Sequence, residues 1–124
     1  MESLYKQAED ALRFAYAPYS RFKVGAALMS KDGRVFTGCN VENIAYGATI
    51  CAERVAFTKA VSEGVTDFKA IAIASSSSIS CPPCGCCRQV MSEFCEEDFM
   101  IILKNKTFTL KELLPESFDI EEMC

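Results

Sequence analysis

The sequence of 124 residues contains no histidine. Histidine is the usual general base and the commonest metal ligand, so its absence leaves cysteine, aspartate and glutamate to carry out any hydrolytic chemistry. Long hydrophobic runs are also missing. The longest, such as residues 99–103, are far shorter than the roughly 20 residues that a membrane span requires. Residues 1–10 contain no basic segment followed by an apolar one, so we expect no secretory signal.

Positive charge is scarce and scattered. The formal net charge is −4, and the 13 basic residues form no stripe of the kind that binds nucleic acid, which favours a small-molecule substrate. The length and the 50% hydrophobic content predict one domain over residues 1–124. Eight cysteines are fewer than a secreted disulfide scaffold of this length would have, so we expect reduced thiols and a cytoplasmic protein.

Hydrophobic periodicity and turn residues predict alternating helices and strands. We expect helices over residues 4–15, 49–63 and 84–95, and strands over residues 22–29, 34–38, 68–74, 99–103 and 107–109. Asp32-Gly33 predicts a tight hairpin turn between the first two strands. Thr109 and Glu112 have the spacing of a capping box before a short last helix. The alternation indicates an α/β layered domain.

Three cysteines and a glutamate have the pattern of an open zinc site. Cys51 lies at the start of the second expected helix, while Cys84 and Cys87 share one side of the third, directly after Pro82-Pro83. The N-terminal end of a helix stabilises thiolates, which are the form that binds metal. A catalytic zinc keeps three protein ligands and one open position for water, whereas a structural zinc usually has four. Glu53 is then free to move protons.

Other interpretations of the cysteines are open. The Cys84-Gly85-Cys86-Cys87 segment also fits a redox dithiol, and buried cysteines often serve as small hydrophobic residues. A closed structural zinc site would need a fourth thiol, for which the candidates are Cys39, Cys81 and Cys86. A structural-zinc or thiol-redox protein has no use for Glu53. We expect Cys95 and Cys124 to be passive.

Segments along nearly the whole chain resemble the cytidine deaminases of the short, homotetrameric type. Cys-Ala-Glu-Arg at 51–54 and Pro-Cys-Gly-Cys-Cys-Arg-Gln at 83–89 carry the resemblance at the metal motif. It extends to Tyr-Ala-Pro-Tyr-Ser-Arg-Phe-Lys-Val-Gly-Ala-Ala at 16–27, Gly-Cys-Asn-Val-Glu-Asn at 38–43 and Leu-Leu-Pro-Glu-Ser-Phe at 113–118. The resemblance implies a three-layer α/β/α fold with a central mixed five-stranded sheet.

The resemblance also implies an activity, which is hydrolytic deamination of cytidine and 2′-deoxycytidine to the uridine products with release of ammonia, as in pyrimidine salvage. It assigns one Zn²⁺ per subunit to Cys51, Cys84 and Cys87. Glu53 would be the proton shuttle between water, ring N3 and the leaving amine. Arg54 would offset the excess negative charge of three thiolates by hydrogen-bonding to sulfur.

For the substrate, the resemblance implies that Phe22 stacks on the pyrimidine and that the backbone of Ala52 contacts the base edge. Asn40 and Glu42 would contact the sugar hydroxyls. From the residue types alone, a phenylalanine in an apolar strand belongs to the core and the Asn40–Glu42 pair caps a loop. These alternatives are open, as is a substrate that is a cytosine-containing nucleoside antibiotic.

The resemblance further implies a homotetramer in which Phe118 reaches the site of a neighbouring subunit, with Tyr46 a weaker candidate at the same boundary. We expect no nucleic-acid or membrane partner. Pro82 and Cys86 depart from the family pattern, which commonly has a small hydroxyl residue and an alanine there. Cys86 adds a thiol next to a metal ligand, where it could exchange as a ligand or become oxidised.

Overall fold

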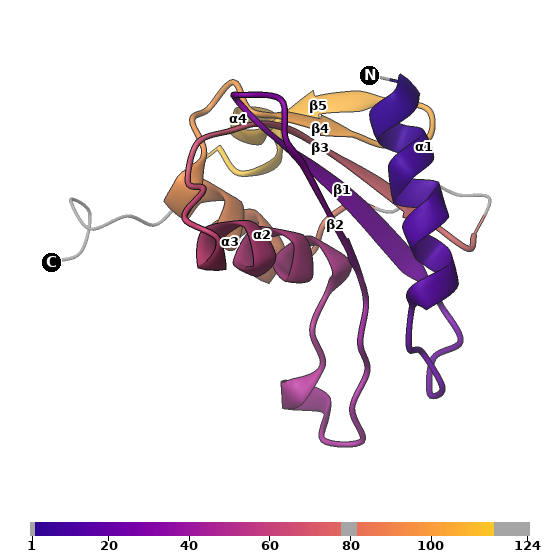
Figure 1. The fold of residues 1–124 in the computed structure, drawn as a ribbon. Coiled ribbons are helices and arrows are strands. Elements are labelled where there is room, and N and C mark those ends of the chain that lie inside the picture. Colours follow the sequence, from indigo (N-terminus) through magenta and orange to yellow (C-terminus); the bar gives the residue numbers. More distant parts are fainter. Residues whose placement is uncertain (1, 78–81, 116–124) are drawn as a thin grey trace, which may run out of the picture.

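The computed structural model describes residues 2–77 and 82–115, which form a five-stranded sheet with helices on both faces (Figure 1). The strands lie in the order β2-β1-β3-β4-β5. Their bounds are Val24–Ser30 for β1, Val35–Cys39 for β2, Phe68–Ser75 for β3, Met100–Ile102 for β4 and Thr107–Thr109 for β5. The β3–β4 pair is parallel and the other described pairs are antiparallel, so the sheet is mixed. This confirms the expected fold class.

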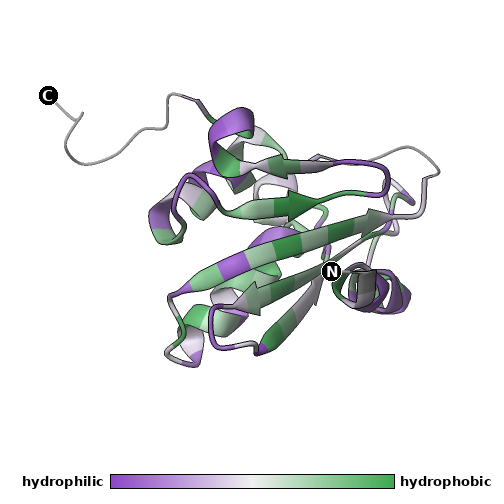
Figure 2. Ribbon diagram, turned by 90° about the horizontal axis from the view of Figure 1, so that it is seen from above, coloured by the Kyte–Doolittle hydropathy of each residue, from purple (hydrophilic) through white to green (hydrophobic). Residues whose placement is uncertain are grey.

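Helices cover the two faces of the sheet unequally. Helix α1 (Glu2–Ala11) packs alone on one face, where Leu4 and Ala8 meet small side chains of β1 and β3. Helices α2 (Ala52–Ser62) and α3 (Gly85–Phe94) share the opposite face with a larger core. The buried strand β3 is hydrophobic along most of its length (Figure 2). None of the helices in residues 2–77 and 82–115 is long and apolar enough to cross a membrane.

Two glycines in the sheet let the helix backbones approach closely. A Cβ at position 25 in β1 would lie 2.2 Å from the carbonyl oxygen of Ala8 in α1. A Cβ at position 38 in β2 would lie 2.5 Å from the carbonyl oxygen of Ala52 and 2.7 Å from the amide nitrogen of Ala56, both in α2. The first turn of α2 is therefore held directly against strand β2.

Local sequence signals are confirmed at the turns and caps. Gly33 has a φ of 94° in the β1–β2 turn, where its N–H donates to the carbonyl of Ser30 at 3.0 Å. Thr109 and Glu112 form both bonds of the predicted capping box before α4 (Leu110–Leu113).

The structure corrects several element boundaries. Helix α2 begins at Ala52 and not at residue 49, because the backbone of Ile50 instead forms an antiparallel bridge with Val41. The first helix ends at Ala11 and continues as a 3-10 turn, η1 (Leu12–Phe14). Strand β1 begins at Val24, after a left-handed residue at Arg21 interrupts the extended chain. A second 3-10 turn, η2 (Tyr46–Ala48), lies in the predicted loop. That residues 1–124 form a single domain stays a prediction.

Candidate metal centre and active site

Cys51, Cys84 and Cys87 converge where two helices begin. Their Sγ atoms all lie within 4.8 Å of one another. Cys51 is the N-cap of α2, Cys84 is the N-cap of α3, and Cys87 lies in the first turn of α3. The unpaired N–H groups and the positive dipole end of each helix favour negative charge at these sulfurs. The structure therefore brings together the three predicted ligands from two separate segments.

The thiols of Cys51 and Cys87 affect each other's pKa in opposite directions. A hydrogen bond from Cys87, with help from Arg54, lowers the pKa of Cys51 to about 5. The same bond to Cys51 raises the pKa of Cys87. A thiolate in contact with thiols is a ligand set from which a divalent metal can displace the remaining protons.

The donor set fits zinc. Three sulfurs bound tetrahedrally at about 2.3 Å from zinc would lie about 3.8 Å apart, so a cluster within 4.8 Å closes by small side-chain rotations. Arg54 lies beside the cluster, with Nη2 4.0 Å from Cys51 Sγ and 3.1 Å from the carbonyl oxygen of Thr49. Its Nε is buried and has no hydrogen-bond partner among residues 2–77 and 82–115. A guanidinium with an unused donor at this place suits a site that accumulates negative charge on three sulfurs.

The other described cysteines do not join the cluster. Cys86 is exposed and follows Cys84 by two residues, so it lies on a different side of α3 from the ligand pair. Cys39 and Cys95 are also outside the group, and burial raises the pKa of Cys95 to about 12. This geometry contradicts a fourth ligand from Cys39 or Cys86. Cys81 and Cys124 lie outside the described residues.

Glu53 lies in the first turn of α2, two residues after Cys51, and its side chain is only 5% exposed. Burial raises the pKa of its carboxyl group to about 7. A carboxyl group in this condition can both accept and donate a proton near neutral pH. Its neighbour Ala52 is fully buried.

Asn40 and Glu42 follow β2 and bind backbone groups of residues 19–24, which lead into β1 and include its first residue. Asn40 is 8% exposed; its Oδ1 accepts the N–H of Val24 at 3.0 Å, and its Nδ2 donates to the carbonyl of Phe22 at 2.8 Å. One oxygen of Glu42 accepts the N–H groups of Tyr19 at 3.0 Å and Ser20 at 3.1 Å. The loop-capping role favoured by the residue types is therefore present.

The aromatic candidates differ in their placement. Phe22 is 38% exposed and lies before β1, so the alternative that places it in the core is wrong. Tyr46 is 88% exposed in η2. Phe118 lies outside the described residues.

Arg88 has a defined structural role that its sequence position does not reveal. Its Nε donates to the carbonyl of Pro83 and its Nη1 to the carbonyl of Leu113, each at 2.8 Å. These bonds fix the segment that leads into Cys84 against the end of α4. The partners lie 5 and 25 residues away, and no local signal predicts the longer connection.

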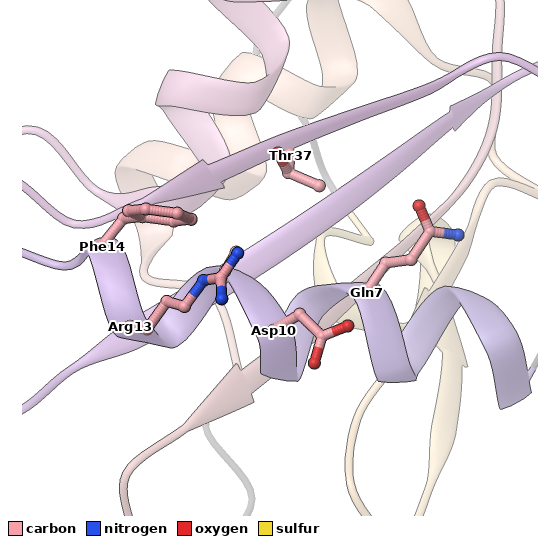
Figure 3. A pocket seen from close by; sticks show the side chains of 6 residues that line it. Gln7, Asp10, Arg13, Phe14 and Thr37 are labelled. Carbon is pink, nitrogen blue, oxygen red and sulfur yellow. The ribbon is translucent and has the colours of Figure 1, made fainter.

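A cavity of about 240 Å³ lies between α1, η1 and β2, lined by Gln7, Asp10, Arg13, Phe14 and Thr37 (Figure 3). Its lining includes none of the site residues predicted from the sequence. A neighbouring cavity of about 300 Å³ shares Phe14 and Thr37 and adds Cys39 and Lys59.

Comparisons with known proteins agree with this site. The family model for the cytidine and deoxycytidylate deaminase zinc-binding region matches residues 1–103. The cytidine deaminase of Halalkalibacterium halodurans is 50% identical over 127 residues, covering 98% of this chain and 96% of the relative. The cytidine deaminase of Sporosarcina psychrophila is 45% identical, covering 99% and 94%.

Solved structures show the same similarity. The crystal structure of cytidine deaminase from Burkholderia pseudomallei has a TM-score of 0.90 and 44% identity, covering 94% of this chain and 98% of that one. The enzyme from Mycobacterium tuberculosis has a TM-score of 0.89 and 41% identity, covering 96% and 97%. With its three converging thiols and a zinc-binding region matched over residues 1–103, the chain belongs to the cytidine and deoxycytidylate deaminase family.

Proposed function

We propose that this protein is a zinc-dependent cytidine deaminase that hydrolyses cytidine and 2′-deoxycytidine to uridine and 2′-deoxyuridine with release of ammonia. The observation that carries the proposal is a buried carboxyl group, Glu53, beside a cluster of three cysteines and no fourth described ligand. Three protein ligands leave a position for water, which a structural zinc site does not. The relatives named cytidine deaminase support the choice of substrate.

Zinc held by Cys51, Cys84 and Cys87 would lower the pKa of a water molecule towards about 7. Glu53 takes a proton from that water at its carboxylate and gives it to N3 of the cytosine ring. The oxygen left by this transfer bonds to C4, and Glu53 then moves the proton of the resulting C4 hydroxyl to the amine, so that the C4–N bond breaks and ammonia leaves while C4 becomes a carbonyl. Because burial already raises the pKa of Glu53 to about 7, the same group serves as base and acid without a large energetic cost for either step.

Three thiolates and one Zn²⁺ would give the metal centre a net charge of −1. This negative charge would weaken the attraction of the metal for an oxygen nucleophile. Arg54 is proposed to offset this charge, because its guanidinium contacts Cys51 and retains one unused buried donor. The N-terminal ends of α2 and α3 contribute in the same direction.

Phe22, Ala52, Asn40 and Glu42 are proposed to bind the nucleoside. Phe22 has an exposed ring available for stacking on the base. Within the part of the chain that the structure describes, each polar atom of the Asn40 amide has one partner, so Oδ1 keeps a lone pair and Nδ2 keeps a hydrogen for a sugar hydroxyl. Glu42 likewise keeps one acceptor position, on Oε2 of its carboxylate.

We further propose a cytoplasmic homotetramer. Large apolar side chains are exposed along residues 41–50, which project from the sheet (Figure 1), and on the neighbouring residues 16–22. They are Tyr16, Tyr19, Phe22, Val41, Ile44, Tyr46 and Ile50. Such a surface is typical of a subunit interface. Six free cysteines among the described residues suit a reducing compartment.

Phe118 is proposed, from the resemblance, to complete a neighbouring site. A Phe118→Ala variant and a Glu53→Gln variant should each be weak alone, yet recover activity when unfolded and refolded together, because a mixed assembly contains sites with both residues. Sedimentation gives the oligomeric state. A monomeric active protein, or no recovery on mixing, contradicts this part of the proposal.

The test of the function is the loss of ultraviolet absorbance from cytidine and 2′-deoxycytidine, measured together with bound zinc. Glu53→Gln should lower kcat by about 10²-fold to 10⁴-fold while zinc stays bound. The matched control is Glu63→Gln, an exposed carboxyl at the opposite end of the same helix, which should behave as wild type. Full activity in Glu53→Gln contradicts the mechanism. A wild-type protein that turns over neither nucleoside contradicts the function, and turnover of a cytosine nucleoside antibiotic would then identify the substrate class.

A further inference from the structure

Two segments that carry proposed substrate-binding residues are joined side by side by backbone hydrogen bonds. The N–H of Tyr16 donates to the carbonyl of Asn40 at 2.9 Å, and the N–H of Glu42 donates to the carbonyl of Tyr16 at 2.8 Å. The N–H of Asn40 donates to the carbonyl of Val24 at 3.1 Å. The loop over residues 17–23 is thus anchored at both ends beside residues 40–42.

Ser20 connects the two segments inside this frame. Its hydroxyl donates to Oε2 of Glu42 and accepts the N–H of Phe22 at 3.0 Å. A serine hydroxyl has one hydrogen to donate, and here that hydrogen is committed to Glu42. The Ser20 oxygen therefore fixes two groups. One is the Glu42 carboxylate, which is proposed to bind the sugar, and the other is the backbone of Phe22, whose ring is proposed to stack on the base.

The bonds to Glu42 define which acceptor positions remain. Oε1 already accepts the N–H groups of Tyr19 and Ser20, and Oε2 accepts the Ser20 hydroxyl. A carboxylate has about four acceptor positions, so one remains on Oε2. The Ser20 hydroxyl occupies the other position on Oε2 and, together with the two N–H groups on Oε1, fixes the plane of the carboxylate and hence the direction of the free position.

The backbone of Phe22 is held from both sides. Its N–H is bound to Ser20, and its carbonyl accepts from Nδ2 of Asn40 at 2.8 Å. Arg21 before it has a φ of 60°, a left-handed conformation that is uncommon for residues other than glycine and needs support from its neighbours. The bond between Ser20 and Phe22 spans this residue.

From these contacts we infer that Ser20 is a positioning residue for the nucleoside site, acting mainly by orienting the Glu42 carboxylate towards a sugar hydroxyl. The inference rests on the proposed function, because it gives a role to Ser20 in binding the same substrate. Ser20 has no part in the proton transfers of Glu53. Its loss should weaken binding of the sugar and leave the chemical step nearly unchanged.

The experiment compares Ser20→Ala with Ser20→Thr, which keeps a hydroxyl at the same place. Ser20 is exposed, so the added methyl group of threonine has room. In Ser20→Ala, the KM for cytidine and the inhibition constant of uridine should rise about fivefold to tenfold, with kcat within about twofold of wild type. The inhibition constant of 2′,3′-dideoxyuridine, which lacks the vicinal hydroxyls, should rise less than about twofold. Ser20→Thr should restore the wild-type values.

Ser62→Ala is the matched control, because it also removes an exposed serine hydroxyl. The Ser62 hydroxyl donates to the backbone carbonyl of Lys59 at the end of α2 and contacts none of the proposed substrate-binding residues. It should leave every constant unchanged. Equal losses for uridine and dideoxyuridine, an unchanged KM in Ser20→Ala, or failure of threonine to restore binding overturns the inference while the proposed function stands. A wild-type protein inactive on both nucleosides overturns the proposed function first, and the inference with it.

Discussion

Replacing Gly38 with alanine should displace the proposed metal ligand Cys51, although Gly38 is neither a proposed metal ligand nor a proposed substrate-binding residue. Gly38 lies in β2 beneath the first turn of α2, the turn that contains Ala52 and Glu53 and follows Cys51. The added Cβ would lie 2.5 Å from the carbonyl oxygen of Ala52, where an ordinary contact begins at 3.4 Å. The two nearest atoms belong to the backbone of α2, so no side-chain rotation relieves the clash.

The size of the displacement follows from these distances. The start of α2 must move by about 0.9 Å to restore an ordinary contact. Zinc–ligand distances in proteins vary by only about 0.2 Å, so Cys51 could keep its bond to the metal only by rotating its side chain away from its present position. Overpacking of this kind costs about 1–3 kcal/mol of stability. We expect zinc affinity to fall about tenfold to a hundredfold, as when other supports of metal ligands are removed.

Gly25→Ala is the control for this prediction. Its Cβ would lie 2.2 Å from the carbonyl oxygen of Ala8, a comparable clash against α1 on the opposite face of the sheet. Zinc affinity is measured by competition with a coloured chelator, and stability by thermal unfolding. Both variants should be destabilised, and Gly38→Ala alone should lose zinc affinity in the folded protein. Equal zinc affinity in Gly38→Ala and wild type would refute the reasoning that this contact positions Cys51.

Three further outcomes are expected. Arg54→Gln should lower zinc affinity or turnover at neutral pH by about tenfold, because it leaves excess charge on the sulfurs; unchanged values in chelator competition and kinetic assays would remove this role. Asp32→Asn should lower stability at pH 7. The hydrogen bonds of Asp32 with Arg34 and Ser30 lower its pKa to about 2, so its contribution is present above the ordinary carboxyl pKa near 4 and is lost as pH falls towards 2. The stability difference from wild type, measured in urea, should therefore narrow below about pH 4, and a constant difference would contradict the assignment. Removal of zinc with a chelator should lower the unfolding temperature and make Cys51 and Cys84 reactive in a colorimetric thiol assay, while Cys87, which is only 1% exposed, should react once the protein unfolds; unchanged thiol reactivity would count against these ligands.

Elements with local signals could be predicted from the sequence. The Asp32-Gly33 turn, the Thr109–Glu112 capping box and the two prolines before α3 each act within a few residues, and the structure contains each feature at its predicted place. The pairing of Cys84 with Cys87 is similarly local, because residues three apart share a side of a helix. The same geometry separates Cys86 from the cluster.

Features that depend on distant contacts could not be predicted in this way. Helix α2 starts late because Ile50 pairs with Val41, and no residue in 49–51 signals that bridge. The bonds of Asn40 and Glu42 reach back 16 to 23 residues. Residue types alone favoured a loop cap, and the structure shows that cap. The proposed contacts with sugar come from the resemblance and use the acceptor and donor positions that the cap leaves free.

The convergence of Cys51 with Cys84 follows from the order of the strands. Strands β2 and β3 are each antiparallel to β1, which lies between them, so they are parallel to each other. Helix α2 connects β2 to β3, and α3 connects β3 to the parallel strand β4, with both helices on the same face. Each helix therefore begins near the carboxyl end of a parallel strand, at one edge of the sheet, where ligand sites of open α/β sheets form. The order of the elements along the chain can be predicted from the sequence, but the position of β1 between β2 and β3 in the sheet cannot. Once this strand order is known, the topology requires that α2 and α3 begin close together. The three thiols at these two helix starts are therefore brought together as well.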